Sequence, residues 1–392
     1  MKDGLRPHKP CPCFSKDKTH MALIDTAKRY GILTINDTAS NYGNRLQNYA
    51  LETLLSSYGT ATTIQHYLDA ADGGSLAKIS ARRNLSEVKK AVLGHVPNPA
   101  NLEYRRRWEE LRFTAKYIGK SPVTISQAKG LSPNGRDLDK IVLGSDQVWN
   151  DRHLSQADLK IRLGMFAPSE RVMSYAASFG VDHVREENEG IFRLALERMS
   201  MIGVREFRAK ELVEELSGRK ATVVLDPTLM VPAEQWRTIT RGFVPEGERY
   251  VLTYFLGGIS KERGAAIEAF AKAHGCTVRR ILDPSDPETY IAGPQDFVEL
   301  FSKAAYVCTD SYHACCFSLL FDKPFRVFAR EGIKQNDKMN SRMETLFRLF
   351  DLDASIESGA DVTMPELDYA RISAELYRQR TISRTWLEQA LR

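Results

Sequence analysis

The residues best suited to chemistry lie in one short segment of the second half of the chain. Residues 309–313 read Thr-Asp-Ser-Tyr-His, after the strand-like run 304–308 and before a run with helical spacing, 316–320. In an open α/β sheet, ligands bind where a strand gives way to a helix, and a helix N-terminus attracts anions. Ser311 and His313 would add a hydroxyl and a titratable imidazole there. The pattern fits equally well a plain helix cap formed by Asp310 or Ser311.

Polar residues also follow other strand-like runs. The runs 140–143, 171–176, 201–204 and 222–225 end respectively in Gly144–Asn150, Ser178, Arg205 and Asp226. Because the carboxyl ends of parallel strands meet at one edge of a sheet, these residues should share a crevice. The run 30–35 leads likewise into a polar turn that holds Asn41 and Asn44, before a helical pattern over 46–55.

Two arginines suit an anionic ligand at this crevice. Arg205 stands at a strand end, and Arg342 lies in the first turn of a helix predicted at 340–350, where a cation opposes the helix dipole. Arginine binds carboxylate and phosphate through two parallel hydrogen bonds. With His313 as acid/base group, the set suits a small, doubly anionic substrate whose reaction moves a proton.

The alternation of short apolar strands with helices indicates buried parallel sheets. It is interrupted between Pro227 and Pro245 and restarts with strands at 250–255 and 277–282 and helices at 261–274 and 294–303. The sequence therefore predicts an α/β protein with two Rossmann-like domains facing a cleft. We place the domains at 29–232 and 233–352, after a disordered arm, 1–28. We expect the tail and terminal helix, 353–392, to cross back to the first domain.

Composition excludes several classes of protein. The 392 residues are 43% hydrophobic and 27% charged, with no apolar run long enough to span a membrane. No secretory signal precedes the six cysteines, so we expect reduced thiols and a cytoplasmic location. Cys11 and Cys13 alone make a weak metal site, and we expect neither metal nor bound cofactor. The net charge of +5 suits small anions better than nucleic acid.

A basic helical insertion is predicted at 75–120. Its arginines and lysines lie on helical patterns with leucines and valines. A solvated face explains this pattern. Contact with an anionic membrane surface or a phosphorylated lipid carrier at the inner face of the membrane is the other interpretation.

Motifs of other enzyme classes are missing from the sequence. Ser311 is not in a Gly-x-Ser-x-Gly elbow, no Walker loop occurs, and the turn after 30–35 lacks the glycines of a dinucleotide fingerprint. Serine hydrolases, ATP-dependent phosphoryl transfer and Rossmann cofactors are therefore disfavoured.

Several segments together resemble the polysaccharide pyruvyl transferases, from about Gly31 to about Leu352. They are Asn41–Asn44 with Leu46-Gln47, Gly144–Trp149, Ser174–Gly180, Val204–Glu206, Leu225–Thr228, Thr309–His313 and Asn340–Arg342. The resemblance implies a two-domain, glycosyltransferase-B-like architecture. It also implies transfer of a pyruvyl group from phosphoenolpyruvate onto two hydroxyls of a sugar in a surface or exopolysaccharide, with release of phosphate.

The resemblance also implies roles for particular residues. His313 and Asp310 would be catalytic, with His313 the acid/base group. Arg205, Ser311 and Arg342 would bind phosphoenolpyruvate. The acceptor sugar, on a glycan or a lipid-linked oligosaccharide, would contact Asn41, Asn44, Gln47, Ser145, Asp146, Gln147, Trp149 and Ser178, with the Trp149 indole available for stacking. This chain departs from the family pattern at Ala314-Cys315-Cys316.

Two other functions fit the same architecture. One is a glycosyltransferase that uses a nucleotide-sugar, with Asp283 or Glu299 as the ribose-binding carboxylate. The other is a catalytically silent relative that binds glycans.

Overall fold

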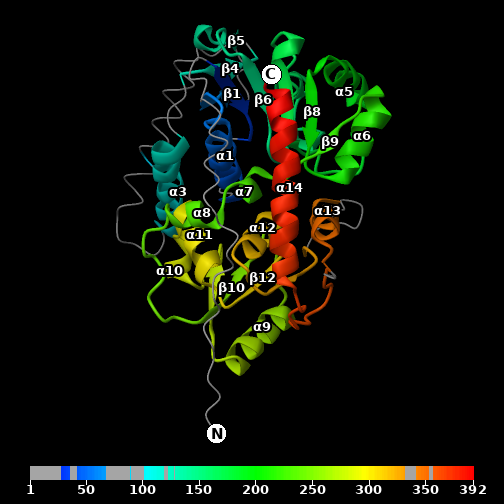
Figure 1. The fold of residues 1–392 in the computed structure, drawn as a ribbon. Coiled ribbons are helices and arrows are strands. Elements are labelled where there is room, and N and C mark those ends of the chain that lie inside the picture. The colour runs from blue at the N-terminus through cyan, green and yellow to red at the C-terminus, as the bar shows by residue number, and fades with distance from the viewer. Residues whose placement is uncertain are drawn as a thin grey trace, which may run out of the picture.

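The computed structural model describes residues 28–35, 42–67, 89, 101–118, 122–127, 129–331, 341–352 and 356–392. The predicted arm lies outside these residues except for Lys28, as does most of the predicted basic insertion. Two α/β halves are stacked one above the other, and the terminal helix runs alongside both (Figure 1).

The first half is built on a six-stranded parallel sheet of order β2-β1-β6-β7-β8-β9. Its strands are β1 (Arg29–Leu33), β2 (Thr60–Thr63), β6 (Lys140–Leu143), β7 (Val172–Ala177), β8 (Met201–Val204) and β9 (Thr222–Val223). β9 is shorter than predicted, because the amide of Leu225 donates to Ser383 Oγ instead of to a strand (2.9 Å).

The second half is built on a four-stranded parallel sheet of order β11-β10-β12-β13. Its strands are β10 (Tyr250–Tyr254), β11 (Thr277–Ile281), β12 (Tyr306–Thr309) and β13 (Phe325–Val327). The prediction of an α/β fold with two parallel, Rossmann-like sheets is thus confirmed.

Sequence analysis missed a small third sheet. It consists of β3 (Gln65–Tyr67), β4 (Thr124–Ser126) and β5 (Gly130–Leu131). β3 pairs parallel with β4, and β4 pairs antiparallel with β5. Strands of two or three residues show too little alternation to be recognised in a sequence.

The helices that connect the strands alternate with them along the chain. The α-helices are α1 (Tyr42–Leu55), α3 (Leu102–Phe113), α4 (Gln156–Arg162), α5 (Glu186–Arg198), α6 (Phe207–Ser217), α7 (Pro227–Met230), α8 (Ala233–Arg237), α9 (Lys261–Ala273), α10 (Pro287–Tyr290), α11 (Pro294–Lys303), α12 (Tyr312–Leu320), α13 (Ser341–Phe350) and α14 (Tyr369–Ala390). A π-helical turn (Thr114–Ile118) continues α3, and short 3₁₀ turns lie at Pro133–Gly135, Asp151–His153 and Ser169–Arg171.

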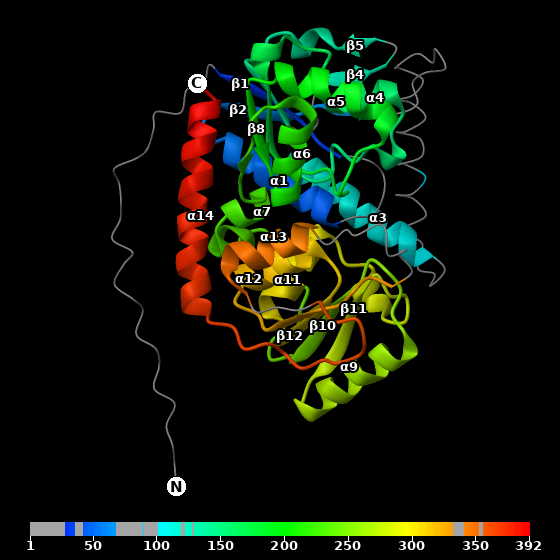
Figure 2. The same ribbon diagram turned by 90° about the vertical axis from the view of Figure 1, so that its right-hand side faces the viewer.

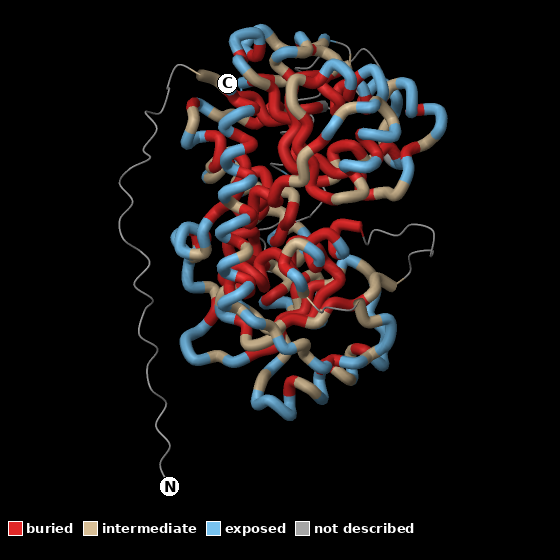
Figure 3. Tube along the Cα trace, turned by 45° about the vertical axis from the view of Figure 1, so that its right-hand side comes forward, coloured by how far each residue is buried: buried red, intermediate tan, exposed pale blue. Residues whose placement is uncertain are grey.

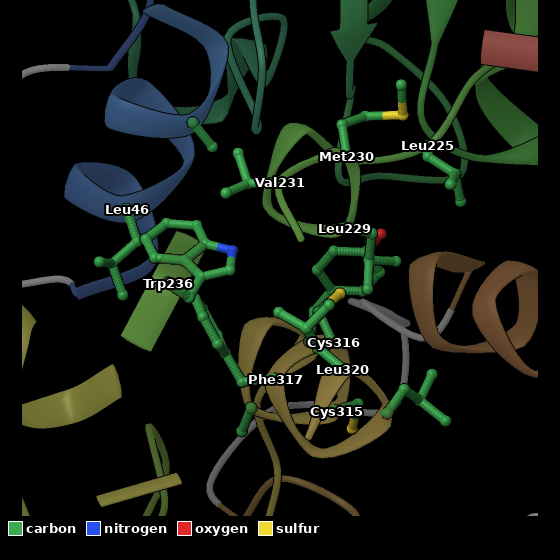
Figure 4. Packing of buried hydrophobic residues seen from close by; sticks show 14 of the residues in the cluster. Leu46, Leu225, Leu229, Met230, Val231, Trp236, Cys315, Cys316, Phe317 and Leu320 are labelled. Carbon is green, nitrogen blue, oxygen red and sulfur yellow. The ribbon is translucent and has the colours of Figure 1, made fainter. Parts of the chain in front are cut away.

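One hydrophobic cluster joins the two halves. Trp236 of α8 packs edge-on against Phe317 of α12, with ring centroids 5.1 Å apart, and Leu46 of α1 and Leu229 of α7 belong to the same cluster (Figure 4). The Trp236 indole N–H donates to the carbonyl of Thr228 (3.0 Å), so its polar edge is satisfied in the core. Buried residues fill the inside of both halves of the molecule (Figure 3).

The terminal helix α14 crosses back to the first half, as predicted (Figure 2). Arg380 Nε donates to the carbonyl of Leu229 (2.6 Å), and Ser383 accepts the amide of Leu225. Trp386 lies so close to Gly203 of β8 that a Cβ there would meet the indole at 2.6 Å. Glycine at 203 therefore permits the helix to lie directly on the sheet.

The described part of the basic insertion consists mainly of α3 and the π-helical turn that continues it, and α3 packs into the protein. Arg106 is buried, with its guanidinium 4.7 Å from the centroid of the Tyr290 ring. Arg107 and Arg112 pair with Glu103 and Glu109 of the same helix. Along the part of the chain that the structure describes, no helix combines the length and the apolar character that a membrane span requires.

Candidate functional site

The candidate site is a cavity of about 190 Å³ between the two halves. It lies where strand order reverses in both sheets, between β1 and β6 in one and between β10 and β12 in the other. Such switch points are the usual ligand sites of open α/β sheets. The polar residues that line the cavity are Asn44, Asp146, Gln147, Asp310, Ser311, His313, Arg330 and Arg342.

Asp310 holds the turn that forms one wall of the cavity. Its carboxylate accepts the backbone amides of Leu256 (2.7 Å) and Gly257 (2.8 Å), and Arg330 Nε lies 3.4 Å away. Both oxygens are therefore engaged in joining the ends of β10 and β12. This bonding supports a positioning role for Asp310, and the catalytic role expected from the sequence stays a prediction.

Ser311 precedes α12 without capping it through its side chain. The residue has the extended conformation of an N-cap (φ −107°, ψ 129°), but its side chain makes no cap hydrogen bond. The hydroxyl lines the cavity beside the first turn of α12. The interpretation of Ser311 as a side-chain cap is wrong, and the hydroxyl is available to a ligand.

His313 projects from the first turn of α12 and is buried. Its Nε2 lies 3.8 Å from Asp226 Oδ2 and has no hydrogen-bond partner among the described residues. The ring packs against Gly43 so closely that a Cβ at that position would overlap the imidazole. Burial lowers the pKa of His313, and nearby Asp226 and Asp146 oppose that effect only in part. The imidazole is therefore neutral at pH 7.

Arg342 offers a buried positive charge to the cavity. It lies in the first turn of α13 and is 8% exposed, and no carboxylate of the described residues pairs with it. With its amide oxygen turned toward the guanidinium, Gln147 accepts two hydrogen bonds from Arg342, at 2.9 and 2.6 Å. Burial, and then the neighbouring Arg205, lower the pKa of Arg342 to about 10. A buried cation with only a neutral partner favours an anionic ligand.

Arg205 lies beneath the cavity and does not line it. Its Nη1 donates to Asp226 (2.9 Å) and its Nη2 to Asp146 (3.0 Å), and its guanidinium stacks 4.6 Å from the centroid of the Tyr312 ring. Burial acts against ionisation of Asp146, but Arg205 and His313 outweigh it and lower the pKa of Asp146 to about 2. Two carboxylates thus occupy the guanidinium that was expected to hold phosphoenolpyruvate.

The residues predicted to bind an acceptor sugar divide into two groups. Asn44, Asp146 and Gln147 line the cavity. Four others are fully buried away from it, namely Gln47, Ser145, Trp149 and Ser178. Asn41 lies outside the described residues.

Each of the four buried residues has a structural contact. Gln47 donates to Thr34 Oγ1 (2.8 Å) and accepts the amide of Ser145 (3.2 Å), and Ser178 donates to Glu206 (2.8 Å). The Trp149 ring packs 5.2 Å from that of Phe179, so the expected stacking of this indole on a sugar is wrong for this conformation.

Three residues of the site were assigned no individual chemical role in the sequence analysis, although Asp226 was expected at the crevice. They are Gly43, which packs on His313, Asp226, which faces His313 Nε2, and Arg330, which borders the cavity. Asp226 and Arg330 both follow strands, so their positions at strand ends were the available signal. Gly43 stood in a segment that carries the family resemblance, but its contact with His313 could not be predicted, because that side chain lies 270 positions later in the chain.

Metal binding has no support among the residues that the structure describes. They contain no group of three or more His, Cys, Asp or Glu side chains that could hold an ion. Cys11 and Cys13 lie outside them.

Comparison with known proteins identifies the family. Residues 41–332 match the sequence model of the family described as polysaccharide pyruvyl transferase. The match covers well over half of the chain, and the chain therefore belongs to this family. No curated protein matches the chain.

Solved structures that align with the chain are distant in sequence. The UDP-GlcNAc 2-epimerase from Methanocaldococcus jannaschii is 12% identical, with a TM-score of 0.42 and coverage of 89% of this chain and 92% of that one. The UDP-GlcNAc 2-epimerase from Neisseria meningitidis bound to UDP-GlcNAc is 11% identical, with a TM-score of 0.40 and coverage of 90% and 100%. An O-GlcNAc transferase mutant from Thermobaculum terrenum is 12% identical, with a TM-score of 0.36 and coverage of 93% and 64%.

Proposed function

We propose that this chain transfers a pyruvyl group from phosphoenolpyruvate onto two hydroxyls of a sugar in a surface or exopolysaccharide, forming a cyclic ketal and releasing phosphate. The observation that carries the proposal is Arg342, a buried guanidinium without a carboxylate partner among the described residues, in the same cavity as His313. Family membership agrees with a transferase that acts on polysaccharide.

The donor would bind at the junction of α12 and α13. Phosphoenolpyruvate carries a phosphate and a carboxylate, and Arg342 can bind either through two hydrogen bonds. The Ser311 hydroxyl and the free amides at the N-terminus of α12 add donors to the same side of the cavity. Arg330 adds positive charge at its border. From beneath the cavity, Arg205 keeps Asp226 and the cavity-lining Asp146 ionised, and it supports the donor site without touching the donor.

The reaction needs one proton to be moved by the protein. A sugar hydroxyl gives up its proton to the neutral imidazole of His313, which delivers it to the methylene carbon of phosphoenolpyruvate. The methylene becomes the methyl group of the pyruvyl unit, C2 becomes electrophilic, and the hydroxyl oxygen bonds to it. The C2–O bond to phosphate breaks, and the second hydroxyl closes the ketal. Its proton leaves with the phosphate.

The acceptor would approach from the first half of the molecule. Asn44 of α1 and Gln147 after β6 face the cavity and present amides that can bind sugar hydroxyls. Asp146 lines the same wall but already pairs with Arg205. We keep Asn41 in the acceptor set on the sequence pattern alone, since it lies outside the described residues.

The test is to incubate the protein with phosphoenolpyruvate and a panel of glycosides. Mass spectrometry would detect pyruvyl addition, and a phosphate assay would follow turnover. His313→Ala should remain folded and release no phosphate, whereas His183→Ala, which alters an exposed histidine outside the cavity, should behave as the wild type. Normal phosphate release by His313→Ala would refute the assignment of the acid/base group.

A second cavity supports the alternative of a nucleotide-sugar glycosyltransferase. It has a volume of about 430 Å³ and lies beside the N-terminus of α9, lined by Gly257, Gly258 and Asp283. A strand, a glycine-containing turn, a helix and an acidic residue after the next strand form the general arrangement of a mononucleotide site. The side chain of Asp283 accepts the amide of Ser285 (2.9 Å) and would have to share that oxygen with a ribose.

Thermal shift measurements separate the candidates. Stabilisation by phosphoenolpyruvate, and not by UDP or GDP, supports the pyruvyl transferase. The reverse result supports the glycosyltransferase. If neither ligand raises the Tm, the silent glycan-binding relative becomes the better explanation.

A further inference from the structure

We infer that Asp226 is the positioning residue of His313, and that the two form a carboxylate–imidazole pair assembled across the cleft from opposite halves of the molecule. Its catalytic consequence rests on the proposed function, but the pair itself can be tested without any substrate.

The two residues come from different sheets. His313 follows β12 of the second sheet, in the first turn of α12, whereas Asp226 follows β9 of the first sheet and is the N-cap of α7. Their facing atoms, Nε2 and Oδ2, are 3.8 Å apart. Both side chains are buried, and Nε2 has no other partner among the described residues. The pair therefore exists only while the halves are closed on one another.

Asp226 is held rigidly in its ionised form. Its Oδ1 accepts the amide (3.0 Å) and hydroxyl (2.7 Å) of Thr228, and its Oδ2 accepts Arg205 Nη1 (2.9 Å) and Ser145 Oγ (3.2 Å). Burial acts to raise the pKa of Asp226, but the outcome is a lowered pKa, because protonated His313, Arg205 and these hydrogen bonds favour the anion. Arg205 and the hydrogen bonds remain in place when His313 is neutral. A fixed carboxylate can only accept a hydrogen bond from the imidazole.

The carboxylate therefore selects one tautomer of His313. When one ring nitrogen faces a hydrogen-bond acceptor, the proton of a neutral imidazole resides on that nitrogen. Here the proton lies on Nε2, and Nδ1 is left as the basic nitrogen. Nδ1 lies on the side of Gly43, in the first turn of α1, and the next residue, Asn44, lines the cavity. An acceptor hydroxyl that approaches along α1 would meet Nδ1, give it a proton and bond to C2 of the donor.

Other charged groups near the imidazole do not replace Asp226. Asp146 also acts to raise the pKa of His313, whereas Arg205 and Arg342 act to lower it. Among the described carboxylates, only that of Asp226 lies within 4.0 Å of a ring nitrogen. The separation of 3.8 Å exceeds a hydrogen bond, and in ligand-free sites such bonds are commonly long and shorten when substrate binds.

The test is nitrogen-15 NMR of the histidine side chains of the ligand-free protein at pH 8, where the imidazole is neutral. The signals of His313 are those lost in His313→Gln. The wild type should show the Nε2–H tautomer. Asp226→Asn presents an amide that can donate to Nε2, so the population should shift to the Nδ1–H tautomer. An Nδ1–H tautomer in the wild type would overturn the inference, even if the variant failed to fold.

A matched variant separates positioning from packing. Thr228→Val removes one hydrogen bond to Asp226 Oδ1 and leaves the carboxylate in place, so it should keep the Nε2–H tautomer. An equal tautomer change in both variants would mean that the packing around Asp226, and not its charge, sets the state of His313.

Kinetics then test the catalytic consequence. Asp226→Asn should lower kcat by about 10²- to 10⁴-fold, which is the usual contribution of a general acid–base group to the rate. The KM for phosphoenolpyruvate should change by less than about 3-fold, because Asp226 does not line the cavity. Unchanged kcat would overturn the positioning role. If the wild type transfers no pyruvyl group at all, the proposed function fails while the tautomer result still stands.

Discussion

The positive charge of Arg342 should lower the stability of the ligand-free protein and raise its affinity for phosphoenolpyruvate. The variant Arg342→Met tests both effects. Burial holds the pKa of this guanidinium at about 10. The ordinary value is near 12.5, and each pKa unit corresponds to 1.36 kcal/mol, so the buried charge opposes folding by about 3 kcal/mol. The sign follows from linkage, because a base whose pKa is lowered by folding is penalised at every pH below the folded value. The penalty is therefore present in full at pH 7.

Methionine has a similar length and no charge, so the ligand-free variant should be more stable than the wild type. Allowing for the two hydrogen bonds lost to Gln147, we expect the Tm to rise by about 1–3 °C. Donor affinity should fall at the same time. Truncating one partner of a buried charge pair costs about 2–5 kcal/mol, so the Kd of phosphoenolpyruvate should rise at least about 30-fold.

Differential scanning calorimetry and isothermal titration calorimetry measure these two changes. Arg348→Met is the matched control, because Arg348 lies on the same helix but is exposed and stacks on Phe207 outside the cavity. It should leave the Kd unchanged. If Arg342→Met bound phosphoenolpyruvate with the wild-type Kd, Arg342 would not be the anion site. If its Tm were lower than that of the wild type, the buried charge of Arg342 would not destabilise the ligand-free protein.

Three further predictions concern other parts of the molecule. Gly43→Ala should reduce kcat by more than about 10-fold, because the new methyl group would displace His313, whereas Gly190→Ala, where a Cβ meets open space, should add up to about 1 kcal/mol of stability. Arg205→Met should cost about 3–5 kcal/mol in urea unfolding, since two buried carboxylates lose their cation; a cost below 1 kcal/mol would contradict the network. Burial, and then a neighbouring arginine, lower the pKa of His66 to about 4. Stability should therefore fall as the pH drops below about 6.5, by about 2 kcal/mol at pH 5, and His66→Gln should abolish that part of the decline.

Much of the fold could be predicted because its signals are local. The helix predicted at 294–303 is α11, with the same bounds, because Pro294 begins it and its apolar residues recur with helical period. The parallel sheets followed from continuous apolar runs between helices. The third sheet could not be predicted, since its strands are stabilised by pairing with one another and not by their own pattern.

The site was predictable in position but only partly in composition. Polar residues at strand ends indicated the edge of the sheet where the cavity lies. Which of them face the cavity depends on pairings between distant segments. Ser145 and Ser178 lie at the predicted edge, but their hydroxyls bond to Ala176, Asp226 and Glu206 inside the protein.

The two arginines show what sequence and tertiary structure each determined. By itself, the sequence determined that Arg205 would follow a strand and that Arg342 would begin a helix, because periodicity and capping are properties of neighbouring residues. Only the tertiary structure decided which arginine is open to a ligand. Asp146 and Asp226 reach Arg205 from other strands and enclose its guanidinium, whereas Arg342 meets the neutral amide of Gln147 and faces the cavity.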